Sequence, residues 1–202
     1  MLLPNQLTVL RIILTPFVVY FLVNDSEFYN EIALVLYLIA ALTDWYDGWL
    51  ARKFNYFSNW GRIWDPIADK ILTAGTLLSL VYLQKLMLIP VVLILLRDFL
   101  ITGLRAYADY LNKPFPTSRY AKFKTVVQLV FINYVIVCHI FAKMSLFPVV
   151  AQDIFRIMID YFWINIALGV VTLITLDSGL RYVFKHKKLI VQLFSKENRI
   201  EN

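Results

Sequence analysis

Six long stretches of the chain are dominated by apolar side chains, and short polar stretches separate them. A helix needs about 20 predominantly apolar residues to cross a bilayer, with a range of about 17 to 25. Each of the six stretches is close to this length, and none of them is interrupted by a long polar insertion. We therefore predict transmembrane helices at residues 7–23, 30–50, 61–83, 86–110, 120–142 and 158–184.

The composition supports a membrane protein. Hydrophobic residues make up 60% of the 202 residues and charged residues 17%, whereas a typical soluble domain is nearer half apolar and about a quarter charged. A single cysteine, Cys138, excludes an internal disulfide. The sequence thus predicts an all-α integral membrane protein, with one six-helix transmembrane domain at residues 1–184 and a basic polar tail at residues 185–202.

Lys and Arg residues indicate the orientation of the chain in the membrane. They concentrate in the connection after the second predicted helix, in the connection after the fourth, and in the tail. Basic residues are typical of cytoplasmic loops, so both termini are expected in the cytoplasm. The chain has 20 Lys and Arg residues against 14 Asp and Glu residues. Because the basic residues are scattered over several loops, a nucleic-acid-binding surface is not expected.

Four aspartates lie within 26 residues, near the cytoplasmic ends of the second and third predicted helices: Asp44, Asp47, Asp65 and Asp69. The spacings i,i+3 and i,i+4 place each pair on one face of its helix. The connection between the two helices is short, so the helices are expected to be antiparallel neighbours. The four carboxylates then converge at one depth, just inside the cytoplasmic boundary.

Such a cluster of carboxylates needs positive charge, because repulsion and desolvation both oppose ionisation. Oxygen ligands suit Mg²⁺, Mn²⁺ or Ca²⁺. Two such ions clamp the attacking and leaving oxygens of a phosphoryl displacement, and a carboxylate can then act as general base. A cation transporter is the alternative that composition leaves open. The four aspartates occupy one level, however, and no second carboxylate cluster continues across the membrane.

The order of these residues is also characteristic. The chain reads Asp44-x2-Asp47-Gly48-x2-Ala51-Arg52-x8-Gly61-x3-Asp65-x3-Asp69, which resembles the complete signature of the CDP-alcohol phosphatidyltransferase family. The resemblance implies a six-helix membrane enzyme, usually a homodimer, in which a hydroxyl acceptor displaces CMP from a CDP-alcohol. It also implies a divalent-metal site open to the cytoplasm, with Mg²⁺ or Mn²⁺ as the cofactor and two ions expected.

The resemblance assigns roles by matched position. Asp44, Asp47 and Asp65 would be metal ligands, and Asp69 would be the catalytic base, near or on the second metal. The donor's CDP group would contact residues of the signature and of an N-terminal element that the family shares. These expected CDP-diacylglycerol-binding residues are Asn5, Thr8, Gly48, Arg52 and Ser58.

Further motifs extend the resemblance over nearly all of residues 1–130. They are the opening Leu3-Pro4-Asn5-x-Leu7-Thr8-x-x-Arg11, the block Asp65-Pro66-x-Ala68-Asp69-Lys70, the run Arg97–Arg105, and Lys122-x-Lys124-Thr125-x-x-Gln128. They are similar to bacterial members of the family that use CDP-diacylglycerol as donor and glycerol 3-phosphate as acceptor. This implies a phospholipid-synthesising enzyme of the bacterial inner membrane. Cardiolipin synthases share the opening and the aspartate block, and they remain the alternative.

A small dianion such as glycerol 3-phosphate needs cationic groups within reach of the metals. The expected groups are Arg97, Arg105, Lys122 and Lys124. Lys122 and Lys124 are about 200° apart on a helix, so the sequence leaves open which of them faces the site. Flanking positive charge is the alternative role for the two lysines, and an ion pair with Asp98 is the alternative for Arg97.

Overall fold

The computed structural model describes residues 3–54, 59–111 and 119–194, and all regular secondary structure in these ranges is helical. Within the described helices, some side chains, including those of Asp44 and Asp47, lie outside the described set. The helices are α1 (Leu3–Asn24), α2 (Glu27–Phe54), α3 (Asn59–Tyr82), α4 (Leu88–Tyr110), α5 (Arg119–Phe141), α6 (Val149–Met158) and α7 (Tyr161–Phe194).

All six predicted membrane helices correspond to helices of the structure, namely α1 to α5 and α7. Three segments in the described part of the chain are long and apolar enough to cross a membrane by composition: Gln6–Asn24, Arg119–Phe141 and Tyr161–Lys187. By contrast, α3 and α4 carry ionisable side chains inside their apolar stretches. The all-helical membrane architecture is therefore supported, whereas six spans and cytoplasmic termini remain predictions.

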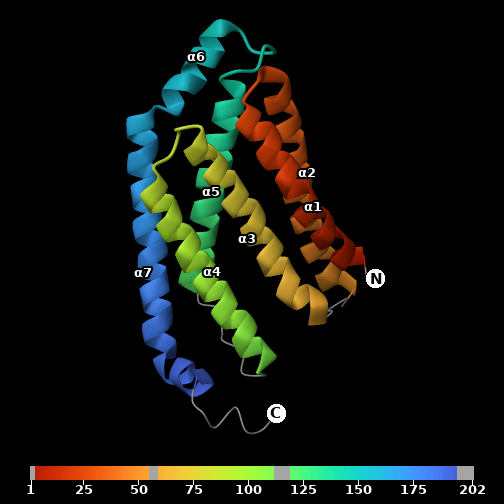
Figure 1. Ribbon diagram of the computed structural model, residues 1–202, viewed down its shortest axis with the longest axis vertical. Coiled ribbons are helices and arrows are strands. Elements are labelled where there is room, and N and C mark those ends of the chain that lie inside the picture. Colours follow the sequence, from red (N-terminus) through yellow and green to blue (C-terminus); the bar gives the residue numbers. More distant parts are fainter. Residues whose placement is uncertain (1–2, 55–58, 112–118, 195–202) are drawn as a thin grey trace.

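The six long helices run side by side along the long axis of the molecule (Figure 1). The start of α1, the end of α2, the start of α3, the end of α4 and the start of α5 lie at one end, which we call the motif end. The short helix α6 and the turns from α1 to α2 and from α3 to α4 lie at the opposite end, which we call the α6 end. The aspartate signature therefore belongs to one end of the bundle.

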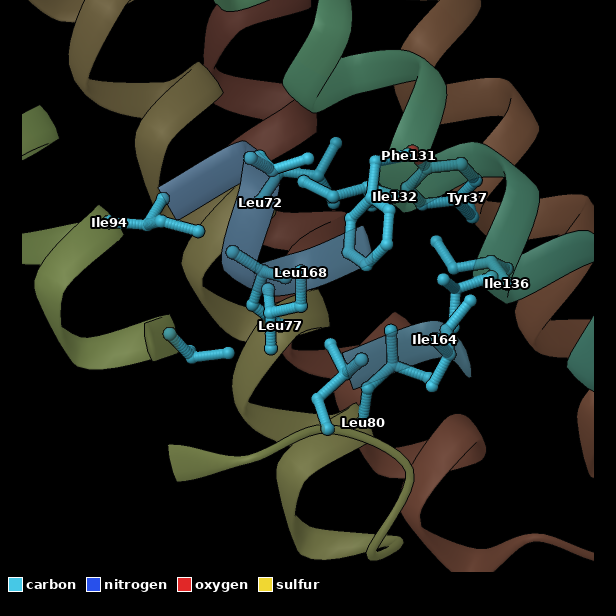
Figure 2. Close-up of a cluster of buried hydrophobic side chains, with 14 of the residues drawn as sticks. Tyr37, Leu72, Leu77, Leu80, Ile94, Phe131, Ile132, Ile136, Ile164 and Leu168 are labelled. Carbon is cyan, nitrogen blue, oxygen red and sulfur yellow. The ribbon is translucent and has the colours of Figure 1, made fainter. Parts of the chain in front are cut away.

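A continuous apolar core joins the central helices. Helix α1 packs against α2 and α3, α4 packs against α3 and α7, and α5 packs against α2, α6 and α7. Figure 2 shows side chains of α3, α4, α5 and α7 meeting in this core: Leu72, Leu77, Leu80, Ile94, Phe131, Ile132, Ile136, Ile164 and Leu168. In a bilayer such contacts stabilise helix association mainly through close packing. The core fixes α3, α4 and α5 relative to one another and so determines which of their polar residues meet.

A glycine on α3 sets how closely α1 approaches. A Cβ atom added at Gly75 would lie 2.8 Å from Cγ2 of Val19 and 3.3 Å from Cγ2 of Thr15. Real Cβ atoms do not approach a carbon at 2.8 Å, so a side chain at this position would push the two helices apart. The close contact matters because α1 and α3 both carry residues of the expected site.

Two parts of the structure differ from the sequence-based expectation, one at the α6 end and the other at the end of α7. Residues 143–157 were expected to be a connection, but they contain most of α6. The Gln152 side chain donates to the carbonyl oxygens of Met144 and Phe147 at 3.1 and 3.0 Å, which orders the turn before this helix. Helix α7 continues past residue 184 to Phe194, into the stretch assigned to the tail. The division into a domain and a tail remains a prediction.

A partly buried ionic contact at the α6 end ties the turn between α1 and α2 to α5. Asp25 accepts hydrogen bonds from Lys143 and, at 3.1 Å, from Asn30, and its Oδ1 lies 3.0 Å from Nε2 of His139. Burial alone would raise the pKa of Asp25, but the hydrogen bonds from Lys143 and Asn30 and the neighbouring positive charges outweigh it. The pKa of Asp25 is therefore below its ordinary value, and the ionised carboxylate stabilises the fold.

We expect Asp25→Asn to lower the free energy of unfolding at pH 7 by about 1–2 kcal/mol, because it removes the charge that Lys143 binds. Asn tolerates the left-handed backbone of this position, where φ is 50°. The contribution of Asp25 is present above the unfolded-state pKa of about 4 and is lost as the pH falls through the lower folded-state pKa. The difference in Tm between wild type and variant, followed by tryptophan fluorescence in detergent, should therefore shrink in acid.

The matched control is Asp153→Asn, which removes an exposed ion pair with Arg156 at the same end of the bundle. Exposed pairs contribute about 0.2–1 kcal/mol, so its Tm should change little. An equal loss in both variants, or a loss at Asp25 that does not shrink as the pH falls below the unfolded-state pKa of about 4, would contradict the assignment.

Candidate functional site

Two of the expected metal ligands have described side chains, and both belong to α3. Asp65 and Asp69 are four residues apart and so lie on one face of the helix. The Asp69 side chain is 32% exposed, so it is accessible from outside the core. Helix α2 carries the other expected ligands near its end. Several sequence-predicted residues lie outside the described side chains or residues: Asn5, Asp44, Asp47, Gly48, Arg52 and Ser58.

Thr8 contacts Asp65, one of the expected metal ligands. Its side chain is completely buried, and its hydroxyl donates to Oδ1 of Asp65. The contact crosses from α1 to α3, where Gly75 allows close approach. A hydrogen bond of this kind fixes the rotamer of the carboxylate and leaves Oδ2 for another partner. The sequence predicted a contact of Thr8 with the donor, and the described contact is with Asp65.

A small cavity lies beside Asp69. Its volume is about 160 Å³, and polar side chains from four helices contribute to its wall: Arg11, Tyr37, Asp69, Thr73 and Asn133. A water molecule occupies about 30 Å³ of the liquid, so the cavity has room for several waters or for a small polar group. Asp69, the base that the resemblance implies, therefore borders a cavity whose wall contains several polar groups.

On another side, Asp69 adjoins a cluster of cations. Lys70 Nζ lies 3.3 Å from Oδ2 of Asp69 and 3.5 Å from Oδ2 of Asp98. Asp98 is only 2% exposed, and its Oδ1 also binds Lys124 and, at 3.0 Å, Nη1 of Arg97. Three cations from α3, α4 and α5 thus surround one buried carboxylate. We call Lys70, Arg97, Asp98 and Lys124 the cation cluster.

Two of the four expected acceptor-binding residues belong to this cluster. Lys124 is 1% exposed, whereas Lys122 is exposed on the surface of α5, so the structure distinguishes the two lysines. Arg105 lies over the ring of Tyr182, with Cζ 5.0 Å from the ring centroid, and its Nε donates to the Tyr182 hydroxyl at 3.4 Å. The structure therefore brings Arg97 and Lys124 together in the cation cluster, to which neither Arg105 nor Lys122 belongs.

Lys70 and Asp98 were not singled out as site residues from the sequence. Both lie inside motifs that carry the family resemblance, directly beside Asp69 and Arg97. The available signal was Asp98 itself, because an aspartate next to an arginine in the middle of an apolar helix is costly unless it has partners. On α7, Asp177 and Arg181 form an exposed ion pair, with Nε and Oδ2 2.8 Å apart.

The described residues fit a site for hard divalent ions. Asp65 and Asp69 supply carboxylate oxygens, the ligands that Mg²⁺ and Mn²⁺ prefer. The described side chains alone contain no group of three or more His, Cys, Asp or Glu residues close enough to hold a metal ion. A complete ligand set would therefore also use the aspartates near the end of α2, as the sequence predicts.

Comparison with known proteins identifies the class. A family model described as CDP-alcohol phosphatidyltransferase matches residues 1–174. The match covers most of the chain, including both halves of the aspartate signature and the cation cluster. The chain belongs to the CDP-alcohol phosphatidyltransferase family.

Several similar proteins share one name. The chain is 36% identical over 127 residues to a CDP-diacylglycerol–glycerol-3-phosphate 3-phosphatidyltransferase of Rickettsia typhi, covering 63% of this chain and 71% of the relative. Proteins of the same name from Wigglesworthia glossinidia brevipalpis and Bacillus subtilis are 34% and 29% identical. These two alignments cover 80% and 91% of this chain, and 93% and 94% of the relatives.

The hydrogen bond from Thr8 to Asp65 generates a prediction. Thr8→Val keeps the shape of the side chain but removes the donor, so Asp65 loses its fixed orientation. Residues that orient metal ligands typically affect metal affinity or activity by about 10- to 100-fold. We expect the Mg²⁺ concentration for half-maximal CMP release to rise by at least about tenfold.

Thr15→Val is the control for this substitution. Thr15 is also buried on α1, but its hydroxyl donates to the carbonyl oxygen of Arg11 in the same helix. Its metal requirement should remain that of the wild type. Equal effects of the two substitutions would mean that α1 acts through packing alone.

Proposed function

We propose that the chain transfers the phosphatidyl group of CDP-diacylglycerol to glycerol 3-phosphate, giving phosphatidylglycerophosphate and CMP. The observation that carries the proposal is the contact of Lys70 with both Asp69 and Asp98. It puts a cation cluster suited to a phosphate directly beside the carboxylates of the family signature. The shared name of the relatives supports the same donor and acceptor.

In the proposed reaction, the primary hydroxyl of glycerol 3-phosphate attacks the β-phosphorus of the donor. A new phosphorus–oxygen bond forms to the acceptor, and the bond to the oxygen of CMP breaks. Asp69 accepts the proton of the attacking hydroxyl, a step that typically contributes about 10²- to 10⁴-fold to the rate. Two Mg²⁺ or Mn²⁺ ions on Asp44, Asp47, Asp65 and Asp69 would offset the charge of the diphosphate.

The remaining proposed contacts divide between the two substrates. Arg97 and Lys124 bind the acceptor phosphate through charge-assisted hydrogen bonds. We propose that the CDP group lies against the α2 part of the signature and the start of α1. The contacts there would come from Asn5, Gly48, Arg52 and Ser58, while Thr8 would act through Asp65.

The proposed membrane arrangement follows from the same chemistry. The motif end faces the cytoplasm, where the water-soluble acceptor is found and CMP is released, and the bundle crosses the bacterial inner membrane six times. The acyl chains of the donor stay in the bilayer, while its headgroup reaches the signature residues. We also propose a homodimer, as the family resemblance implies.

The proposal is tested by supplying labelled CDP-diacylglycerol to the purified protein in detergent with a panel of acceptors. Glycerol 3-phosphate should give phosphatidylglycerophosphate and an equal amount of CMP, and a chelator should abolish both. Phosphatidylglycerol, serine and inositol phosphate should give little product. If phosphatidylglycerol is used instead, the protein is a cardiolipin synthase, and if no CMP is released, the transporter alternative gains support.

Asp69→Asn should lower kcat by at least about 10²-fold, because the amide cannot accept the hydroxyl proton. The variant retains the shape of the side chain, so helix formation and membrane insertion should be unaffected. Asp177→Asn is the matched control, since it removes an exposed carboxylate whose described partners are Arg181 and Tyr120. Turnover of Asp69→Asn within a few-fold of the wild type would rule out Asp69 as the base.

A further inference from the structure

Asp98 has an unusual position among the charged residues of the bundle. It is nearly inaccessible, at 2% exposure, and it contacts cations from three different helices. A buried carboxylate of this kind is not explained by a single ion pair. Its loss would leave three cations close together without the one negative charge at their centre.

The cation cluster carries more positive charge than Asp98 can offset. Lys70, Arg97 and Lys124 supply three positive charges, while Asp98 and the Asp69 carboxylate that Lys70 also contacts supply two negative charges, an excess of one. A phosphate monoester carries about −1.5 to −2 charges near neutral pH. A phosphate monoester would therefore offset the excess positive charge, whereas a neutral acceptor would leave it uncompensated.

The cluster also retains unused hydrogen-bonding capacity. Nε of Arg97 is buried and donates to no described residue, and Oδ2 of Asp98 accepts no hydrogen bond from one. Arg97 uses its other nitrogens, with Nη1 on Asp98 and Nη2 donating to the Ser178 hydroxyl of α7 at 2.8 Å. One edge of the guanidinium is therefore fixed by the protein while the Nε donor remains for an anion.

Contacts around Arg97 and Lys124 restrict both side chains. Lys124 donates to Asp98 and also to Gln128, one turn further along α5. Next to Ser178, Gly179 presents no side chain where the stem of Arg97 passes. Holding these long side chains in place before binding removes an entropy cost that a ligand would otherwise meet.

We propose that Asp98 is the positioning residue of the acceptor pocket, holding Lys70, Arg97 and Lys124 from three helices in one array that receives the phosphate of the acceptor. Asp98 does not touch the substrate. It fixes the cations, and Lys70 connects the array to Asp69, so that a bound phosphate brings its hydroxyl toward the base. This inference rests on the proposed function for the identity of the acceptor.

Asp98→Asn tests the proposal in the full-length protein. The amide oxygen could replace only Oδ1, and the amide nitrogen would then face the Lys70 ammonium, so the array should spread. We expect the KM for glycerol 3-phosphate to rise by about tenfold or more, while the KM for CDP-diacylglycerol changes less than about twofold. An unchanged or lower acceptor KM would show that Asp98 only neutralises part of the positive charge of the three cations and does not position them. The proposal would then be wrong.

Inorganic phosphate provides a readout that does not depend on turnover. Ligand binding to the folded protein raises its Tm by an amount that grows with the logarithm of the ratio of ligand concentration to Kd, so a Kd for phosphate can be obtained from thermal unfolding. Asp98→Asn should raise this Kd by about tenfold or more, and Asp153→Asn should leave it unchanged. If the wild type does not use glycerol 3-phosphate but binds phosphate through Asp98, the proposed function fails and this inference stands. If phosphate does not stabilise the wild type, the inference fails.

Gly179→Ala tests the same array without removing a buried charge. A Cβ atom at this position would lie 3.0 Å from Cγ and 3.4 Å from Nε of Arg97, so Arg97 must shift. Gly169→Ala is the control on the same helix, because nothing lies within 4 Å of its added Cβ. Alanine is favoured over glycine inside a helix by up to about 1 kcal/mol, so both variants should fold. Only Gly179→Ala should raise the acceptor KM and the phosphate Kd, and equal behaviour of the two would overturn the positioning argument even if Asp98→Asn does not fold.

Discussion

Charged groups inside an apolar helical bundle must find their partners within the protein, and this constraint organises the molecule. Water cannot solvate a carboxylate that is packed between apolar helices, so each one needs nearby cations or donors. At the α6 end this requirement is met locally, since Asp25 is bound by Lys143, His139 and Asn30. At the motif end three cations share Asp98, and among them Lys70 also contacts a second carboxylate, Asp69. This cluster therefore carries an excess of positive charge that a bound anion would offset.

Helix α3 connects the two charged regions of the motif end. Successive turns of this helix carry Asp65 and Asp69, and Lys70 follows directly. On one side, α1 reaches Asp65 through Thr8, and on the other, α4 reaches Lys70 through Asp98. A small displacement of α3 would therefore change both the expected metal site and the cation cluster. Close packing of α1 at Gly75 and the apolar core shown in Figure 2 restrict such a displacement.

Much of the helical architecture could be predicted from the sequence, because long apolar runs have few alternatives to a membrane helix. The short helix α6 was missed, since it mixes polar and apolar residues over only 10 positions. The end of α7 was also missed, because its last turns are polar enough to resemble a tail. Hydropathy detects burial in lipid, and it does not detect helices that continue beyond the bilayer or lie outside it.

The candidate site was predictable to the extent that it depends on contacts within one helix. The spacing of Asp65 and Asp69 was sufficient to place them on one face. The choice between Lys122 and Lys124 depends on how α5 is rotated against α4, which single-helix geometry does not determine. Likewise, Arg97 had an ion pair and a phosphate as alternatives, and the structure shows that the ion pair with Asp98 belongs to a larger array. Contacts between helices were the missing information.

An array that binds phosphate would help the enzyme to favour the acceptor hydroxyl over water as the attacking group. Water is small, neutral and abundant, and it could attack the donor at the same phosphorus atom. A site that depended only on a base would activate water and the acceptor hydroxyl alike. Where the binding energy of a phosphate is used to hold the hydroxyl beside Asp69, water receives none of this assistance. The contact of Lys70 with both Asp69 and Asp98 places the two requirements next to each other. Rigid positioning of the cations would thus favour transfer over hydrolysis without any group that repels water.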